Sequence, residues 1–246
     1  MDNEDPFYIA DVSYCAKQYL KWAHNLPRVK PFYAVKTNGN DFIIKIIEKM
    51  GGGFDCASID ELDAVLSVSP DIDCSKRIIY SHPCKQISHM IYFKDRGVQL
   101  TVADNDNELV KIKHYWPNVK ILIRLKVNNS HSLTAFSTKF GVNEYMGVRL
   151  LQLAKELSLN VNGCAFHVGS GCYDKTAFKR SLEFARRLFD IAKKSDYEFK
   201  FTVLDIGGGF LGTDDEEKLS FSEVSKTINQ ALYELFPESE GTVLDF

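Results

Sequence analysis

Short apolar runs alternate with longer amphipathic stretches along the whole chain. The apolar runs are almost continuously hydrophobic, which is typical of parallel strands that are buried on both faces. We expect strands at 31–36, 53–58, 77–82, 97–104, 118–127, 161–169, 201–206 and 242–246. The stretches between them repeat apolar residues at helical spacing. We expect helices at 41–50, 58–69, 84–96, 105–116, 145–158, 175–195 and 220–236.

The strict order of strand and helix favours an α/β fold, a parallel (β/α)8 barrel. An open doubly wound sheet is the alternative. Residues 7–10 predict a short strand and residues 12–25 a helix, which we expect to close the ring in place of an eighth helix. No Pro/Gly/Ser linker divides the chain, so we expect one domain over 1–246. It comprises an N-terminal strand and helix (1–26) and the barrel (27–246).

Two of the predicted helices carry start signals. Ser58 and Glu61 have the spacing of a capping box at the start of the helix 58–69. Asp104 or Asn105 is expected to cap the helix 105–116, with Glu108 inside its first turn.

Composition and charge exclude several classes of protein. With 45% hydrophobic and 26% charged residues, the chain is typical of a globular domain. A net charge of -3 gives no reason to expect nucleic acid or an anionic membrane as partner. No apolar run is long enough to span a bilayer, and the acidic N-terminus predicts no secretory signal. The six cysteines form no CxxC pair, so we expect reduced thiols and a cytoplasmic location.

Chemically capable side chains stand where the predicted strands end, which is the active-site face of a (β/α)8 barrel. They are Lys36, Asp55, Ser58, His82, Asp104, Arg124, His167, Ser170, Asp205 and Gly207 to Gly209. We therefore expect one rim to gather a lysine, an arginine, two histidines, several acids and a run of three glycines.

Lys36 ends an apolar strand, where an ammonium is expected to be partly desolvated. Desolvation lowers the pKa of a lysine and favours the neutral amine that forms a Schiff base. The alternative is a lysine whose ammonium reaches from the strand end to water.

The three glycines and His167 are the next candidates. Backbone N–H groups at Gly207, Gly208 and Gly209 suit close approach to a phosphate, although a flexible turn explains the same run. The His167 imidazole could stack on a flat ring while Ser170 donates to a phosphate. The alternative is a histidine at the edge of the core that is satisfied by backbone groups.

Arg124 and Asp55 lie within otherwise apolar strands, so each needs a partner of opposite charge or a cofactor contact. His82, His167 and Asp205 could meet at the rim, but no HxH or HxxxH spacing supports a metal, and we expect none. The glycine run also lacks the spacing of a dinucleotide-binding fingerprint.

Six ordered motifs together resemble the family of eukaryotic ornithine decarboxylase, the pyridoxal phosphate (PLP)-dependent ornithine/lysine/arginine decarboxylases of fold type III. They are PFYAVKTN at 31–38, GFDCAS at 53–58, PCKQ at 83–86, KFG at 139–141, FHVGSGC at 166–172 and LDIGGGF at 204–210. The resemblance runs from about residue 6 to 241. It implies an alanine-racemase-like barrel followed by a C-terminal β-domain.

The resemblance also implies roles for individual residues. Lys36 would form the Schiff base with PLP, and His167 would stack on the pyridine ring. Arg124 would bond near the ring hydroxyl, while Asp55 and Glu61 would order the side of the site near Lys36. The phosphate ligands would be Ser170, Gly207, Gly208 and Gly209. PLP would then act as the electron sink for the carbanion that remains when CO2 departs.

The end of the chain departs from the family pattern. The family's eighth strand runs into Glu-Pro-Gly-Arg, whose glutamate pairs with the pyridine nitrogen and whose arginine grips the phosphate. This sequence ends at Phe246. We therefore expect the glutamate, the arginine and the β-domain with its substrate-binding acids to be missing from these residues, and turnover by this chain alone to be impaired.

Three functions remain open. The first is a lyase that decarboxylates L-ornithine to putrescine in polyamine biosynthesis, shortened or truncated here and dimeric at full length, with Lys139 matching a lysine that bridges subunits. The second is a non-catalytic regulator resembling antizyme inhibitor, which would bind antizyme through residues 82–106. The basic groups near that segment are Lys76, Arg77, Lys85, Lys94 and Arg96. The third is a related decarboxylase acting on arginine, lysine or another amino acid.

Overall fold

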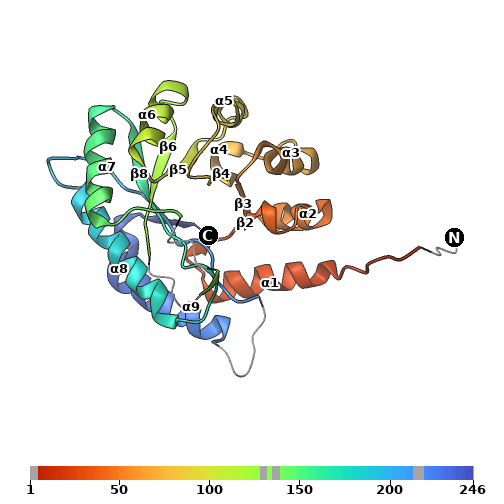
Figure 1. Cartoon of the computed structure of the whole chain (residues 1–246). Helices are drawn as coiled ribbons and strands as arrows, with labels where there is room; N and C mark the ends of the chain where they lie inside the picture. Colours follow the sequence, from red (N-terminus) through yellow and green to blue (C-terminus); the bar gives the residue numbers. More distant parts are fainter. Residues whose placement is uncertain (1–4, 128–131, 135–138, 213–218, 246) are drawn as a thin grey trace.

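A computed structural model describes residues 5–127, 132–134, 139–212 and 219–245 (Figure 1). Nine strands pair in parallel in one sheet that curls into a barrel. In sheet order they are β1 (Val29–Lys30), β11 (Val243–Asp245), β10 (Val203–Asp205), β8 (Asn160–Ala165), β6 (Lys120–Arg124), β5 (Leu100–Ala103), β4 (Ile78–Tyr80), β3 (Gly53–Cys56) and β2 (Phe32–Ala34).

The two ends of the sheet meet in a single chain segment, residues 29–34. β1 pairs with β11 on one side, and β2 pairs with β3 on the other. Pro31, which has no N–H to donate, separates the two halves, and its carbonyl accepts the Gly53 N–H at 2.9 Å. If β1 and β2 are counted as one strand, the described residues form a barrel of eight strands. The predicted (β/α)8 barrel is therefore confirmed. The first strand was predicted at 31–36, but both of its bounds are misplaced, because β1 begins at Val29 and β2 ends at Ala34.

Helices form the outer layer of the barrel (Figure 1). They are α1 (Val12–Asn25), α2 (Asp41–Lys49), α3 (Ile59–Val68), α4 (Cys74–Arg77), α5 (Ile87–Asp95), α6 (Asp106–Tyr115), α7 (Glu144–Glu156), α8 (Lys175–Ala192) and α9 (Phe221–Leu235). Two short 3-10 helices are η1 (Val35–Thr37) and η2 (Glu238–Glu240). Among the described residues, no helix combines the length and apolarity needed to cross a bilayer.

Helix α1 lies between α2 and α9 and contacts both (Figure 1). Trp22 anchors it, because its indole N–H donates to the Val29 carbonyl at 2.8 Å. The same ring packs against Phe210 and Phe221. The helix predicted at 12–25 therefore does fill the gap in the outer ring.

Other features differ from the sequence prediction. Residues 7–10 form no strand, and the Tyr8 side chain is fully exposed because no neighbouring strand pairs with this segment in the described structure. A short antiparallel pair, β7 (Ser132–Thr134) with β9 (Ser170–Cys172), was not predicted. Its strands are too short to show a hydrophobic period.

The predicted helix caps are partly correct. The Ser58 hydroxyl accepts the Glu61 N–H at 3.3 Å, but the Glu61 carboxylate accepts the N–H of Ala57 at 2.7 Å rather than that of Ser58. Asn105, not Asp104, caps α6 by accepting the Glu108 N–H. The Asp104 carboxylate instead accepts the Gly141 N–H at 2.9 Å.

The core has two parts. The larger lies between the sheet and the helices, and the smaller fills the inside of the barrel. The interior cluster consists of Phe32, Ile79, Val102, Leu122 and Ala165. These side chains make the barrel a packed core rather than a pore, so a ligand can enter only at a mouth.

Candidate active site at the carboxyl ends of the strands

A cavity of about 750 Å³ opens at the carboxyl ends of the strands. Helices α1 and α2 contribute an apolar wall that includes Tyr19, Trp22 and Ile43. The polar lining includes Lys36, Asp55, Ser81, His82, Arg124, His167, Ser170 and Asp205, with Gly207 and Gly208 beside them. The structure therefore brings together most of the residues that the sequence placed at the rim. The exceptions, which do not line the cavity, are Ser58, Glu61, Asp104 and Gly209.

Lys36 lies in η1, one turn beyond β2, and it is exposed at the cavity mouth. The expectation that Lys36 is partly desolvated at the end of a buried strand is wrong, because the chain leaves the sheet after Ala34. The charge of Lys36 still acts on the site. It opposes the larger effect of burial, which raises the pKa of Asp55, and it adds to the effect of burial that lowers the pKa of His167.

Asp55 stands on β3 and lines the cavity. Burial raises the pKa of its carboxyl group, and this effect outweighs the opposing influences of Lys36, a hydrogen bond and Arg124. The hydrogen bond comes from the Ser81 hydroxyl, which donates to Asp55 Oδ1. Ser81 was not among the residues expected at the rim, although a hydroxyl near the end of the apolar run 77–82 was a usable signal.

Arg124 ends β6 and points into the cavity among three carboxylates. Burial lowers the pKa of its guanidinium, while Asp205, Asp104 and Asp55 raise it. The guanidinium also lies 5.0 Å from the centre of the Phe140 ring. Arg124 therefore lines the cavity and interacts electrostatically with three carboxylates.

His167 follows β8, and its ring is held by backbone. The Gly169 N–H donates to His167 Nδ1 at 2.9 Å, so hydrogen bonding assigns the proton of the neutral ring to Nε2. Burial, and then the charges of Arg124 and Lys36, lower the pKa of His167 to about 4. A neutral, flat imidazole at the cavity wall suits stacking on a planar aromatic ligand.

The glycine run forms a close-fitting wall beside His167. Gly207 has a φ of 60°, and a Cβ there would lie 1.9 Å from the Phe166 carbonyl oxygen. A Cβ on Gly208 would lie 2.8 Å from His167 Nε2. Side chains are thus excluded where a ligand would approach, and the exposed Ser170 lies on the same cavity. This cradle fits a phosphate, although the Gly207 N–H already donates to Asp205 Oδ1 at 2.7 Å.

The remaining predicted residues lie outside the cavity wall. The Glu61 carboxylate holds the backbone of Ala57, which does line the cavity, so its influence on the site is indirect. Lys139 is exposed in a turn. The part of the chain that the structure describes contains no group of three His, Cys, Asp or Glu residues that could hold a metal ion.

A barrel with a lysine at its mouth, a neutral histidine on its wall and a glycine cradle beside it defines a PLP-binding domain. Residues 12–244 match the family described as "Pyridoxal-dependent decarboxylase, pyridoxal binding domain". The chain belongs to this family, whose cofactor is PLP. The predicted family and cofactor class are confirmed.

Relatives of known sequence agree. The chain is 43% identical over 240 residues to antizyme inhibitor 2 of Xenopus laevis, covering 97% of this chain and 51% of that protein. It is 40% identical over 240 residues to ornithine decarboxylase of Mus musculus, covering 98% of this chain and 51% of that enzyme. The chain therefore spans about half the length of these curated relatives.

Solved structures agree as well. The arginine decarboxylase of Paramecium bursaria Chlorella virus superimposes with a TM-score of 0.88 at 34% identity, covering 95% of this chain and 61% of that one. Ornithine decarboxylase from Entamoeba histolytica gives a TM-score of 0.85 at 31% identity, covering 98% of this chain and 65% of that one. The shared part is the barrel.

Proposed function

We propose that the protein to which these residues belong is a PLP-dependent ornithine decarboxylase, which converts L-ornithine to putrescine and CO2 in polyamine biosynthesis. The observation that carries the proposal is the convergence of Lys36, Asp55, Arg124 and His167 on one cavity beside the glycine cradle.

The chemistry comes from the cofactor, which when bound provides the electron sink for the carbanion left by loss of CO2. Lys36 is the amine that would attach it, and His167 offers the flat face against its ring. Ser170 and the cradle at Gly207 and Gly208 would hold its phosphate. Arg124 would bond near the ring hydroxyl.

Covalent trapping tests the cofactor site. The chain is incubated with PLP, reduced with borohydride and digested, and the pyridoxyl group is located by mass spectrometry. We expect one main adduct, on Lys36. Lys36→Arg should abolish it, while Lys113→Arg, a change at an exposed lysine on α6, should leave it intact. Label spread evenly over surface lysines would contradict the proposed site.

The substrate is tested with the full-length protein. Release of CO2 from ornithine, lysine and arginine is compared at equal concentrations, and we expect ornithine to give the highest kcat/KM. The 246 residues alone should bind PLP but release CO2 at a negligible rate, because they span only about half the length of the ornithine decarboxylase that they match. Brisk turnover by these residues alone would refute the second expectation.

A regulator that binds antizyme is the second candidate, favoured by the 43% identity to antizyme inhibitor 2. The segment 82–106 presents Ile87 and Ile91 as exposed apolar residues on α5, beside the exposed Lys94 and Arg96. Lys85, one of the basic groups first assigned to this surface, is buried and cannot contact a partner.

Pull-down with purified antizyme separates the two candidates. A regulator should retain antizyme and show no decarboxylation at full length, and Ile91→Asp should abolish its retention. The exposed Val110→Asp on α6, outside the segment, is the matched control. Decarboxylation by the full-length protein, with or without antizyme binding, would rule out a purely regulatory role.

We also propose that the full-length protein is a cytoplasmic homodimer. Lys139, which the resemblance assigns to the subunit interface, is exposed and available for such a contact. Light scattering of the full-length protein should give twice the monomer mass, and Lys139→Glu should lower the dimer fraction.

A further inference from the structure

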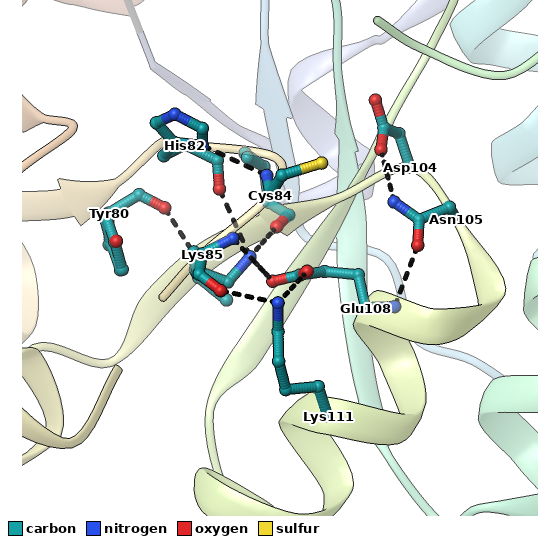
Figure 2. Close-up of polar contacts among 10 residues, drawn as sticks. Tyr80, His82, Cys84, Lys85, Asp104, Asn105, Glu108 and Lys111 are labelled. Atoms are coloured by element: carbon teal, nitrogen blue, oxygen red, sulfur yellow. Dashed lines mark hydrogen bonds and ion pairs between the residues drawn. The ribbon is translucent and has the colours of Figure 1, made fainter. Parts of the chain in front are cut away.

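A group of three charged residues, two of them buried, lies next to the cavity but outside its lining. These residues are Lys85, Glu108 and the partly exposed Lys111, called here the Lys85 cluster (Figure 2). The Lys85 side chain is completely buried, and its ammonium lies 2.8 Å from Glu108 Oε1. Lys111 reaches the other carboxylate oxygen, Oε2, at 2.7 Å and donates to the Lys85 carbonyl at 2.5 Å. A charge this deeply buried is costly unless it is paired and fully hydrogen-bonded.

The two remaining N–H groups of the Lys85 ammonium bind backbone at the mouth of the barrel. They donate to the Val102 carbonyl at 2.6 Å and to the His82 carbonyl at 3.3 Å. Val102 belongs to β5, and His82 follows β4. The ladder between these two strands consists of a single register pair, Tyr80 with Thr101. Lys85 therefore joins the ends of β4 and β5 beyond the point where the strands pair with each other.

The loop after β4 carries two groups of the site. Ser81 donates its hydroxyl to Asp55, and His82 lines the cavity with Pro83 beside it. The imidazole Nδ1 of His82 accepts the Cys84 N–H at 3.1 Å, so the ring is held within this same loop. The charge of Lys85 also lowers the pKa of His82, after the larger effect of burial.

We propose that Lys85 is a positioning residue of the active site: paired with Glu108, it holds the loop 81–84 against the end of β5, and thereby sets Ser81 on Asp55 and His82 on the cavity wall. The proposal adds a specific task to the proposed PLP site and rests on that function only for the cofactor readout described below. A purely structural role, in which the cluster contributes stability alone, is the competing explanation.

The two explanations predict different results when apolar residues replace both Lys85 and Glu108. Removing one partner of a buried ion pair destabilises a protein, whereas replacing both partners with well-packed apolar residues is often neutral or stabilising. The test therefore compares Lys85→Met with the double variant Lys85→Met/Glu108→Leu. Arg186→Met, which breaks an ion cluster with Asp190 and Glu240 on the outside of the barrel, is the control for loss of charge pairs in general.

Two readouts are made on the cofactor-free protein and one with cofactor. NMR follows the titration of the His82 imidazole and of the Asp55 carboxyl group, and borohydride trapping gives the yield of Lys36 adduct at limiting PLP. We expect both Lys85 variants to raise the pKa of Asp55, because the hydrogen bond from Ser81 that lowers it is weakened, to broaden or move the resonances of residues 81–84, and to lower the adduct yield several-fold. The double variant should do so even where its denaturation midpoint matches the wild type.

A double variant with a wild-type Asp55 titration, wild-type resonances for residues 81–84 and a wild-type adduct yield would overturn the proposal and leave stability as the role of the cluster. The positioning role of Lys85 and the PLP site at Lys36 can also be disproved independently of each other. If the wild-type chain gives no adduct at Lys36, the PLP site is wrong, yet the Asp55 titration and the resonances of residues 81–84 in the cofactor-free protein still decide whether Lys85 positions the loop. Should Lys85→Met not fold, Glu108→Gln breaks the same ion pair, and the Asp55 titration and the adduct yield are compared in that variant instead.

Discussion

At the scale of single residues, burial shifts the pKa values of titratable groups in the site. Partial burial raises the pKa of the Asp55 carboxyl and lowers that of the His167 imidazole, so in each case the environment favours the neutral form. Lys36, in contrast, is exposed at the mouth. His167 is thus neutral where a ring would stack, while Lys36 lies at the edge of the cavity and Arg124 lies deeper in it.

His167 should make stability depend on pH. A histidine in the unfolded chain has a pKa of about 6.5, whereas the folded pKa is about 4. Between these values protons bind the unfolded chain more readily, so the free energy of unfolding falls as pH drops from about 6.5 to about 4, by at most about 3 kcal/mol. Below that window this group causes no further loss.

Urea denaturation at pH 7.5 and pH 4.5 measures the effect. His167→Asn cannot take up the proton, so it should lose less stability over this interval than the wild type. His114→Asn, at an exposed histidine on α6, should behave like the wild type. Equal losses in all three proteins would show that His167 is not held neutral.

At the scale of elements, the barrel depends on close approach between neighbouring strands. Gly163 lies on β8 opposite Val203 of β10. A Cβ on Gly163 would lie 1.8 Å from the Val203 carbonyl oxygen. Because backbone, unlike a flexible side chain, cannot move aside locally, only glycine allows these two strands to pair in this register.

Gly163→Ala should therefore destabilise the fold by about 2 kcal/mol or more, as expected for overpacking against a rigid neighbour. Chemical denaturation followed by far-UV circular dichroism checks this. Gly212→Ala is the control, because an added Cβ there meets nothing within 4 Å. A Gly163→Ala protein as stable as this control would mean that β8 and β10 can separate without cost.

At the scale of the whole molecule, the barrel closes through segments from opposite ends of the chain. β1 and β2 contribute to both ends of the sheet, and α1 covers the joint beside α9. Trp22 links these parts, since it donates to the Val29 carbonyl of β1 and packs against Phe221 of α9. One side chain thus connects the first helix, the first strand and the last helix.

Trp22→Ala should detach α1 and cost about 2 kcal/mol of stability, less than a fully buried tryptophan because this one is only partly buried. Hydrogen exchange should show faster exchange in α1 and at Val29. Leu20→Ala, on the exposed face of the same helix, should change neither. Unchanged exchange in Trp22→Ala would show that α1 is held by other contacts.

The sequence by itself determined the order of the elements, the class of fold and the family. Hydrophobic periodicity is a local property, so it located strands and helices even where their ends were misplaced by a few residues. The motifs around Lys36, His167 and the glycines carried the cofactor prediction for the same reason, because each motif is a short continuous stretch.

Only the tertiary structure decided how each side chain is placed. The hydrogen bond from Ser81 to Asp55 and the burial of Lys85 went unforeseen, and only the structure decided between the two alternatives for Lys36 in favour of exposure. Each depends on partners distant in sequence: 26 residues separate Ser81 from Asp55, and 23 separate Lys85 from Glu108. Burial and charge pairing arise between segments that the fold brings together, so no local pattern could distinguish a buried lysine from one at the surface.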